Sequence, residues 1–170
     1  MSLPGPKPLD VDRMADGQAD VDFTVSLADL PRLRSRLQSV GGAVSGRVHF
    51  SRDSGFAVAE LKMSGTATLQ CQRCMESMVV PVDTGTRVAL LSSEANAGRV
   101  PHDLEPVLAP EGRISVEDLV EEELMLYLPI VPRHGSETEC GIVQSAPQVA
   151  DEGPATTQKP FAQLADLLKR

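Results

Sequence analysis

The sequence predicts an α+β fold in which an antiparallel β-meander packs against two or three helices, between a flexible N-terminal arm and a flexible C-terminal tail. Residues 57–71 carry apolar or small side chains at odd positions and, from Glu60 onward, polar ones at even positions, as in a strand with one buried face. A second alternating run, 78–90, follows a Cys-x-x-Cys segment at 71–74. Residues 115–128 instead repeat apolar side chains at helical spacing.

The chain is acidic and poor in aromatic side chains. It has 170 residues, a formal net charge of −8, no Trp, one Tyr and four Phe, which predicts one domain with a mainly aliphatic core. The negative charge argues against a broad nucleic-acid surface, because phosphate binding needs clustered Lys and Arg. It suits a basic partner protein better.

Neither a secretory signal nor a membrane-spanning segment is expected. Residues 1–20 contain no apolar run of signal-peptide type, and no stretch reaches the apolar length of a transmembrane helix. We therefore expect a cytoplasmic protein with reduced thiols and no membrane contact. In that setting three cysteines, two of them at C-x-x-C spacing, favour metal or redox chemistry over structural disulfides.

The predicted domain covers residues 20–134. Residues 1–19, rich in Pro, Gly and Asp, are expected to form the flexible arm. Residues 21–25 alternate as a short strand, and 26–40 have the leucine spacing of a helix. The apolar positions of this helix are Leu27, Leu30, Leu33, Leu37 and Val40.

The meander is predicted from three alternating segments, and a separate short strand follows it in the sequence. Residues 44–51 and 56–71 are expected to pair across a turn at 52–55, whose composition is typical of turns. Residues 78–91 form the third strand, and a short strand is expected at 105–109. The apolar face of this sheet needs a helix or another sheet to cover it.

The most clearly predicted helix is 115–128. Ser115 lies three residues before Asp118, close to the spacing of a capping box, and Pro129 ends the helix. The expected buried stripe consists of Val116, Leu119, Val120, Leu124, Tyr127 and Leu128. Glu117, Glu121 and Glu122 are expected to face water.

The C-terminal part of the chain is predicted to be a linker followed by a short helix. Residues 135–159 are polar and without periodicity, which predicts a flexible linker. Residues 160–170 give a short amphipathic helix with Phe161, Leu164 and Leu168 on one side. This helix is expected to dock on a partner or on its own domain.

Four side chains have the chemistry of a metal site. A tight turn directs Cys71 and Cys74 at a common centre, with Cys140 as a third ligand and His134 as a fourth. Zinc suits such a set, and a closed ligand count makes the zinc structural. The alternative is a set of reduced thiols with Cys71 partly in the core. A thioredoxin-like role fits less well, because a strand and not a helix follows the cysteines.

Other polar groups point to binding rather than to catalysis. A tight turn presents Arg73 outward, where it contacts a phosphate or an acidic group or remains solvated. The acidic run 121–123 has no histidine nearby in sequence, and no known catalytic motif is present. We therefore expect no enzyme activity and no small-molecule substrate.

Three separated motifs together resemble one protein family. They are the C-x-x-C segment 69–74, the helix with its Leu-Pro-x-Val-Pro-x-His continuation at 114–134, and the terminal segment 159–169. The sequence resembles, from about Val21 onward, the YceD-type large ribosomal RNA subunit accumulation proteins. The resemblance implies a non-enzymatic role in the synthesis, processing or stability of 23S ribosomal RNA. It also implies, from gene neighbourhood, binding to a large-subunit ribosomal protein.

One departure from the family concerns the metal ligands. Some relatives carry a second cysteine pair near the carboxyl end, whereas Cys140 stands alone here, which leaves His134 as the substitute ligand. The predicted function is a ribosome-biogenesis factor that binds a large-subunit ribosomal protein or pre-ribosomal RNA. Its expected contact residues are Arg73, Glu121, Glu122, Phe161 and Leu164. The alternatives are a zinc-dependent RNA-processing enzyme and a zinc-stabilised structural module.

Overall fold

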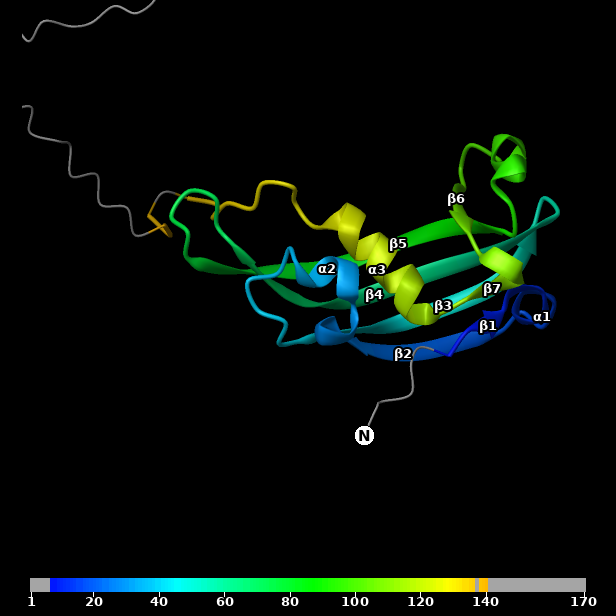
Figure 1. Ribbon diagram of the computed structural model, residues 1–170, viewed down its shortest axis with the longest axis horizontal. Coiled ribbons are helices and arrows are strands. Elements are labelled where there is room, and N and C mark those ends of the chain that lie inside the picture. The colour runs from blue at the N-terminus through cyan, green and yellow to red at the C-terminus, as the bar shows by residue number, and fades with distance from the viewer. Residues whose placement is uncertain (1–6, 137, 141–170) are drawn as a thin grey trace, which may run out of the picture.

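A computed structural model describes residues 7–136 and 138–140. Its main feature is a five-stranded sheet in the order β2-β3-β4-β5-β6, with α3 lying across one face (Figure 1). A two-stranded sheet, β1-β7, lies at one end. The elements are β1 Leu9–Asp10, α1 Val11–Asp16, β2 Asp20–Ser26, η1 Leu27–Asp29, α2 Pro31–Arg34, β3 Ala43–Asp53, β4 Phe56–Gln70, β5 Ser77–Leu91, η2 Glu94–Arg99, β6 Glu105–Leu108, η3 Pro110–Gly112, β7 Arg113–Ile114 and α3 Val116–Tyr127.

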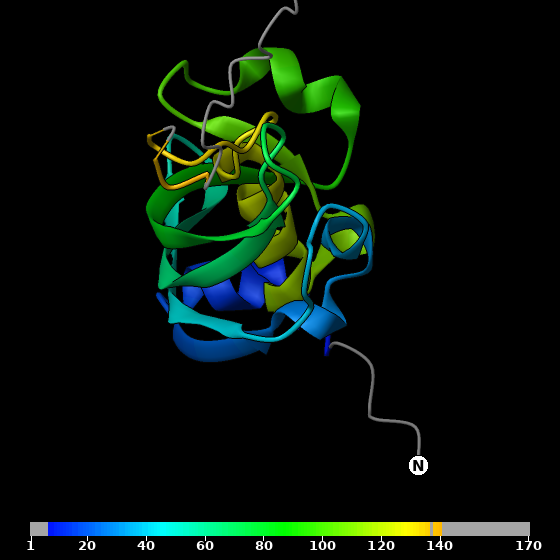
Figure 2. The same ribbon diagram turned by 90° about the vertical axis from the view of Figure 1, so that its left-hand side faces the viewer.

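The α+β architecture and the antiparallel meander are confirmed for β2 to β5. A two-residue turn joins β3 to β4, and both of its residues have positive φ, 50° at Ser54 and 85° at Gly55. Such turns match the right-handed twist of a hairpin. Seen end-on, the long strands curl around α3 (Figure 2).

The last strand of the five-stranded sheet, β6, does not continue the antiparallel meander. β6 pairs in parallel with the end of β5, from Val88↔Glu105 to Leu91↔Leu108. Among the described residues, no strand pairs with the outer edge of β5 at 77–87. Pro81 lies within this edge, where its missing N–H costs no ladder hydrogen bond.

The core lies between the inner face of the sheet and the helices. Its largest fully buried side chains include Phe50, Leu27, Leu30, Leu33, Leu61, Leu124, Val44, Val48 and Val120. The opposite face of the sheet is mostly polar and carries exposed ion pairs such as Arg47–Asp22 and Lys62–Glu60. A small second apolar cluster of Val58, Ala89 and Leu104 is buried separately from the main core. One-sided burial explains the period of two along β4.

The predicted N-terminal arm is wrong from Leu9 onward. Residues 9–10 pair with β7, and α1 follows with Val11 and Ala15 buried. Asp10 caps this helix, since its side chain accepts a hydrogen bond from the N–H of Arg13 at 3.0 Å. The prolines that suggested an arm all lie before Leu9.

The predicted helix over 26–40 is also wrong in its extent. Only η1 and the four-residue α2 are helical, and they are separated at Leu30 with φ −103° and ψ 94°. The residue before a proline avoids the helical region, so Pro31 can begin a helix but cannot continue one from Ser26. Leu27 and Leu33 are nevertheless both fully buried.

The predicted helix over 115–128 is confirmed as α3. Ser115 and Asp118 form the capping box, with Ser115 Oγ accepting from the N–H of Asp118 at 3.0 Å. Tyr127 was expected to be buried but is 39% exposed. It lies in the last turn, and its hydroxyl donates to the carbonyl oxygen of Pro81 at the edge of β5, at 3.4 Å.

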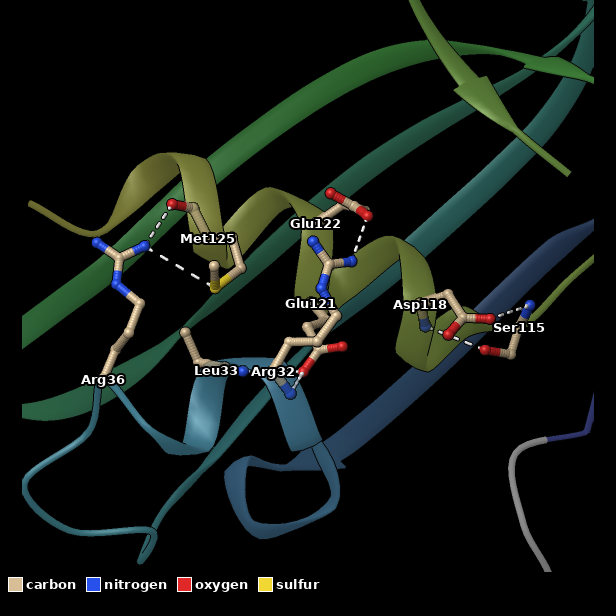
Figure 3. A network of polar contacts seen from close by, with 8 residues as sticks. All are labelled: Arg32, Leu33, Arg36, Ser115, Asp118, Glu121, Glu122 and Met125. Carbon is tan, nitrogen blue, oxygen red and sulfur yellow. Dashed lines mark hydrogen bonds and ion pairs between the residues drawn. The ribbon is translucent and has the colours of Figure 1, made fainter. Parts of the chain in front are cut away.

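The prediction that Glu121 faces water is wrong. Its side chain is buried, and Oε1 accepts hydrogen bonds from the backbone N–H groups of Arg32 at 2.7 Å and Leu33 at 3.0 Å (Figure 3). These are the first N–H groups of α2, whose own N-cap residue, Leu30, supplies no side-chain bond. Glu121 therefore caps α2 from another helix.

Two further contacts of this network join α2 and the following loop to α3 (Figure 3). The side chain of Arg32 is paired with Glu122. Arg36 donates to the carbonyl oxygen of Met125 at 3.0 Å, near the end of α3, where a cation suits the helix dipole.

Candidate metal centre

The first two candidate ligands lie in a tight loop between β4 and β5, which we call the knuckle loop, residues 71–76. The N–H of Met75 donates to the carbonyl oxygen of Cys71, and the N–H of Cys71 donates to that of Glu76, both at 2.9 Å. Met75 has a φ of 65°, a left-handed conformation that an L-residue adopts at a cost. The loop thereby turns both sulfurs to the same side.

The other two candidate ligands arrive on the segment after α3. The N–H of Gln72 donates to the carbonyl oxygen of Pro132 at 2.8 Å, which holds this segment against the knuckle loop. The chain then turns back at Gly135, whose N–H donates to the carboxylate of Glu139 at 3.1 Å. This turn brings both His134 and Cys140 to the knuckle loop.

The four ligand atoms form one compact cluster. The sulfurs of Cys71 and Cys140 are 3.9 Å apart, and Nδ1 of His134 lies 3.5 Å from the sulfur of Cys74 and 3.5 Å from that of Cys140. All four atoms lie within 4.8 Å of one another. In a tetrahedral zinc site, with Zn–S about 2.3 Å and Zn–N about 2.0 Å, the ligand atoms are about 3.8 Å apart for two sulfurs and about 3.5 Å for sulfur and nitrogen. The sulfur–sulfur distance of 3.9 Å and the two sulfur–nitrogen distances of 3.5 Å fit that geometry.

The protonation of the sulfurs depends on their surroundings. Burial opposes a negative charge on Cys71, but backbone N–H groups of Cys74, Arg73 and His134 outweigh it and lower the pKa of Cys71 to about 5. Burial and the neighbouring sulfurs of Cys74 and Cys71 raise the pKa of Cys140 to about 11. A divalent cation among the sulfurs favours the thiolate at every position.

The arrangement has the properties of a structural site. Three sulfurs and one imidazole nitrogen complete a four-ligand set, which leaves no open position for a substrate. Cys71 and Cys140 are buried and all three cysteines are free thiols. An ion bound here would fasten the segment after α3 to the end of the long β4–β5 hairpin.

The other predicted site residues, those expected to contact a partner, differ in how accessible they are. Arg73 is exposed in the knuckle loop, and Glu122 is half-exposed and paired with Arg32. Glu121 is buried and is not available to a partner. Phe161 and Leu164 lie outside the described residues.

Sequence reasoning missed the residues that bring the two halves of the cluster together. Pro132 is buried and accepts the hydrogen bond from Gln72, and Glu139 closes the turn before Cys140. The pair Pro129 and Pro132 could have signalled this extended segment, because proline cannot continue the helix. The contact with the knuckle loop has no local sequence signal.

The fold and the cluster together define an α+β domain with a curled sheet around one long helix and a candidate Cys3His metal centre at the tip of its central hairpin. The chain belongs to the family described as large ribosomal RNA subunit accumulation protein YceD, whose model matches residues 59–168. This range contains all four candidate ligands.

A full-length relative supports the family assignment. The large ribosomal RNA subunit accumulation protein YceD of Haemophilus influenzae is 30% identical over 168 residues, which cover 96% of this chain and 97% of that protein. No solved structure matches the chain. Within the described residues, no helix is long and apolar enough to cross a membrane.

Proposed function

We propose that the protein is a non-enzymatic factor needed for the accumulation of the large, 23S ribosomal RNA. The observation that carries this proposal is the family match over residues 59–168, together with a relative of the same name that aligns along nearly the whole chain. The protein acts in the cytoplasm, by binding a large-subunit ribosomal protein or pre-ribosomal RNA during assembly.

A structural zinc ion at Cys71, Cys74, His134 and Cys140 is part of the proposal. The ligand distances and the donor set support it. The ion shapes the knuckle loop and fixes the segment 129–136 beside it, so that the tip of the hairpin presents one defined surface.

We assign the partner contact to this tip and to the acidic face of α3. Arg73 is exposed at the tip and is suited to a phosphate or a carboxylate. On α3, Asp118 is exposed and Glu122 half-exposed, and a basic ribosomal protein would be attracted to these carboxylates. Glu121 is excluded from this surface because it caps α2.

Complementation of a strain that lacks the gene tests the function. Wild-type protein is expected to restore the ratio of 23S to 16S ribosomal RNA, whereas Arg73→Glu is expected to restore it only in part without losing zinc. Arg113→Glu is the matched control, because Arg113 is an exposed arginine at the opposite end of the sheet. An unchanged ratio on deletion of the gene would refute the proposal.

An affinity pull-down with and without ribonuclease separates the two partner classes. A ribosomal protein that stays bound after the treatment identifies a protein partner and directs mutation to Asp118 and Glu122. If everything recovered depends on RNA, Arg73 and the surrounding tip are the contact.

A further inference from the structure

A small apolar groove lies between α3 and the β5–β6 edge of the sheet. Its volume is about 140 Å³, well below the roughly 300–1,000 Å³ of pockets that hold small molecules. Its apolar walls include Leu61, Val88, Val107, Leu119 and Leu126. A space of this size suits one or two protruding apolar side chains of a protein segment.

The groove has an acidic rim. Glu105, Glu122 and Glu123 line it, and among the described residues no Lys or Arg does so. Arg32 pairs with Glu122 from outside, and Thr84 donates to Glu123 at 2.7 Å. Leu126 stands at the rim with 72% of its surface exposed. An apolar side chain flanked by cations is therefore the complementary ligand.

The terminal segment 159–170 of this chain has that chemistry. It carries three of the 16 basic residues and one of the 24 acidic residues, a net charge of +2, whereas the rest of the chain has a net charge of −10. Phe161, Leu164 and Leu168 recur at the spacing of one apolar helix face. Lys159 precedes this pattern and Lys169 follows it.

The family match covers both the groove and this segment. The match begins at residue 59 and ends at residue 168, so it excludes β1 to β3 but includes every wall and rim residue of the groove. It also extends through Leu168 in the terminal segment.

The connecting chain is long enough for contact within one molecule. Cys140 lies against Cys71 at the tip, and Leu61 is ten residues from Cys71 along β4, a distance of about 33 Å at the rise of a strand. The twenty residues 141–160 span up to about 65 Å when extended. Linkage within one chain also raises the effective concentration to roughly the millimolar range.

We propose that the terminal segment 159–170 docks on the groove of its own chain. Phe161 and Leu164 fill the space between Leu119 and Val107, and the basic residues at either end of the segment face the carboxylates of the rim. A basic amphipathic segment of a partner would compete for the same groove.

Carbodiimide cross-linking of the purified full-length protein tests the proposal. At low protein concentration, we expect amide cross-links between Lys159 or Lys169 and the rim residues Glu105, Glu122 and Glu123. The double variant Phe161→Ala, Leu164→Ala should lower their yield at least fivefold.

A pair of exposed leucine and isoleucine positions provides the matched control. Leu126→Lys places a cation at the groove, and Ile130→Lys makes the same change at a site that does not line it; their wild-type side chains are 72% and 90% exposed, so both variants should fold. Only Leu126→Lys is expected to abolish the cross-links.

Three results would overturn the proposal. The first is the absence of cross-links from the tail to the rim in the isolated protein. The second is mixed-isotope cross-links in a mixture of labelled and unlabelled protein, which would mean that the tail binds a second copy. The third is an equal effect of Leu126→Lys and Ile130→Lys. None of these readouts depends on ribosomal RNA, so failure here is distinguishable from failure of the proposed function.

Discussion

The cap that Glu121 provides to α2 can be tested by a single substitution. In Glu121→Ala, the N–H groups of Arg32 and Leu33 lose their shared acceptor, Oε1. A hydrogen bond to a charged group contributes about 1.5–3 kcal/mol. The hydrogen bond from the N–H of Leu33 is buried, whereas that from the N–H of Arg32 is only part-buried. We therefore expect the free energy of unfolding to fall by about 3 kcal/mol. This is the upper value for one hydrogen bond to a charged group and less than the upper value for two.

Thermal unfolding followed by circular dichroism measures this loss. For a domain of this size, about 3 kcal/mol corresponds to a fall in Tm of roughly 10 °C. Glu121→Gln keeps an acceptor but removes the charge, and should fall between wild type and Glu121→Ala.

Glu122→Gln is the matched control for this prediction. It changes the neighbouring glutamate, whose ion pair with Arg32 is about half-exposed and contributes no more than about 1 kcal/mol. Equal Tm values for Glu121→Ala and Glu122→Gln would refute the capping role of Glu121.

Three further predictions concern the metal centre and the caps. Because zinc binds thiolates, whereas burial and the neighbouring sulfurs raise the pKa of the Cys140 thiol to about 11, zinc binding must release a proton there, and the zinc affinity should fall as the pH is lowered, as measured with a zinc-sensitive dye. Met75→Gly should raise Tm by a few degrees, since glycine adopts a φ of 65° without the cost of about 1 kcal/mol. Ser115→Ala removes the N-cap of α3 and should cost about 1 kcal/mol in urea unfolding.

Each of these predictions has a result that would contradict it. A zinc affinity that does not change with pH would show that protons do not compete for the ligands. A lower Tm for Met75→Gly would mean that the 58% exposed Met75 side chain makes stabilising contacts. An unchanged midpoint for Ser115→Ala would mean that Asp118 or water replaces the cap.

Local patterns in the sequence were sufficient to predict the long strands and α3. The alternation along β4 and the capping box at Ser115 are encoded in neighbouring residues. The errors arise where contacts between distant segments decide the structure. Leucine spacing predicted one helix over 26–40, but the restriction before Pro31 divides it.

The candidate sites show the same difference between features encoded by local patterns and features that depend on contacts between distant segments. The four metal ligands follow from residue type and from the C-x-x-C spacing, and the structure brings them together. The burial of Glu121 has no such signal, because its partners at Arg32 and Leu33 are almost ninety residues away in sequence. The groove beside α3 also depends on the parallel pairing of β6, which the sequence does not indicate.

Native mass spectrometry of the purified full-length protein tests the candidate metal centre most directly. The predicted result is one zinc ion per chain, lost in Cys74→Ser and in Cys140→Ser but retained in Ser136→Ala, a change in the same turn as Cys140. Wild-type protein that remains free of zinc when zinc is supplied, or zinc that survives both cysteine substitutions, would contradict the assignment of Cys71, Cys74, His134 and Cys140 as its ligands.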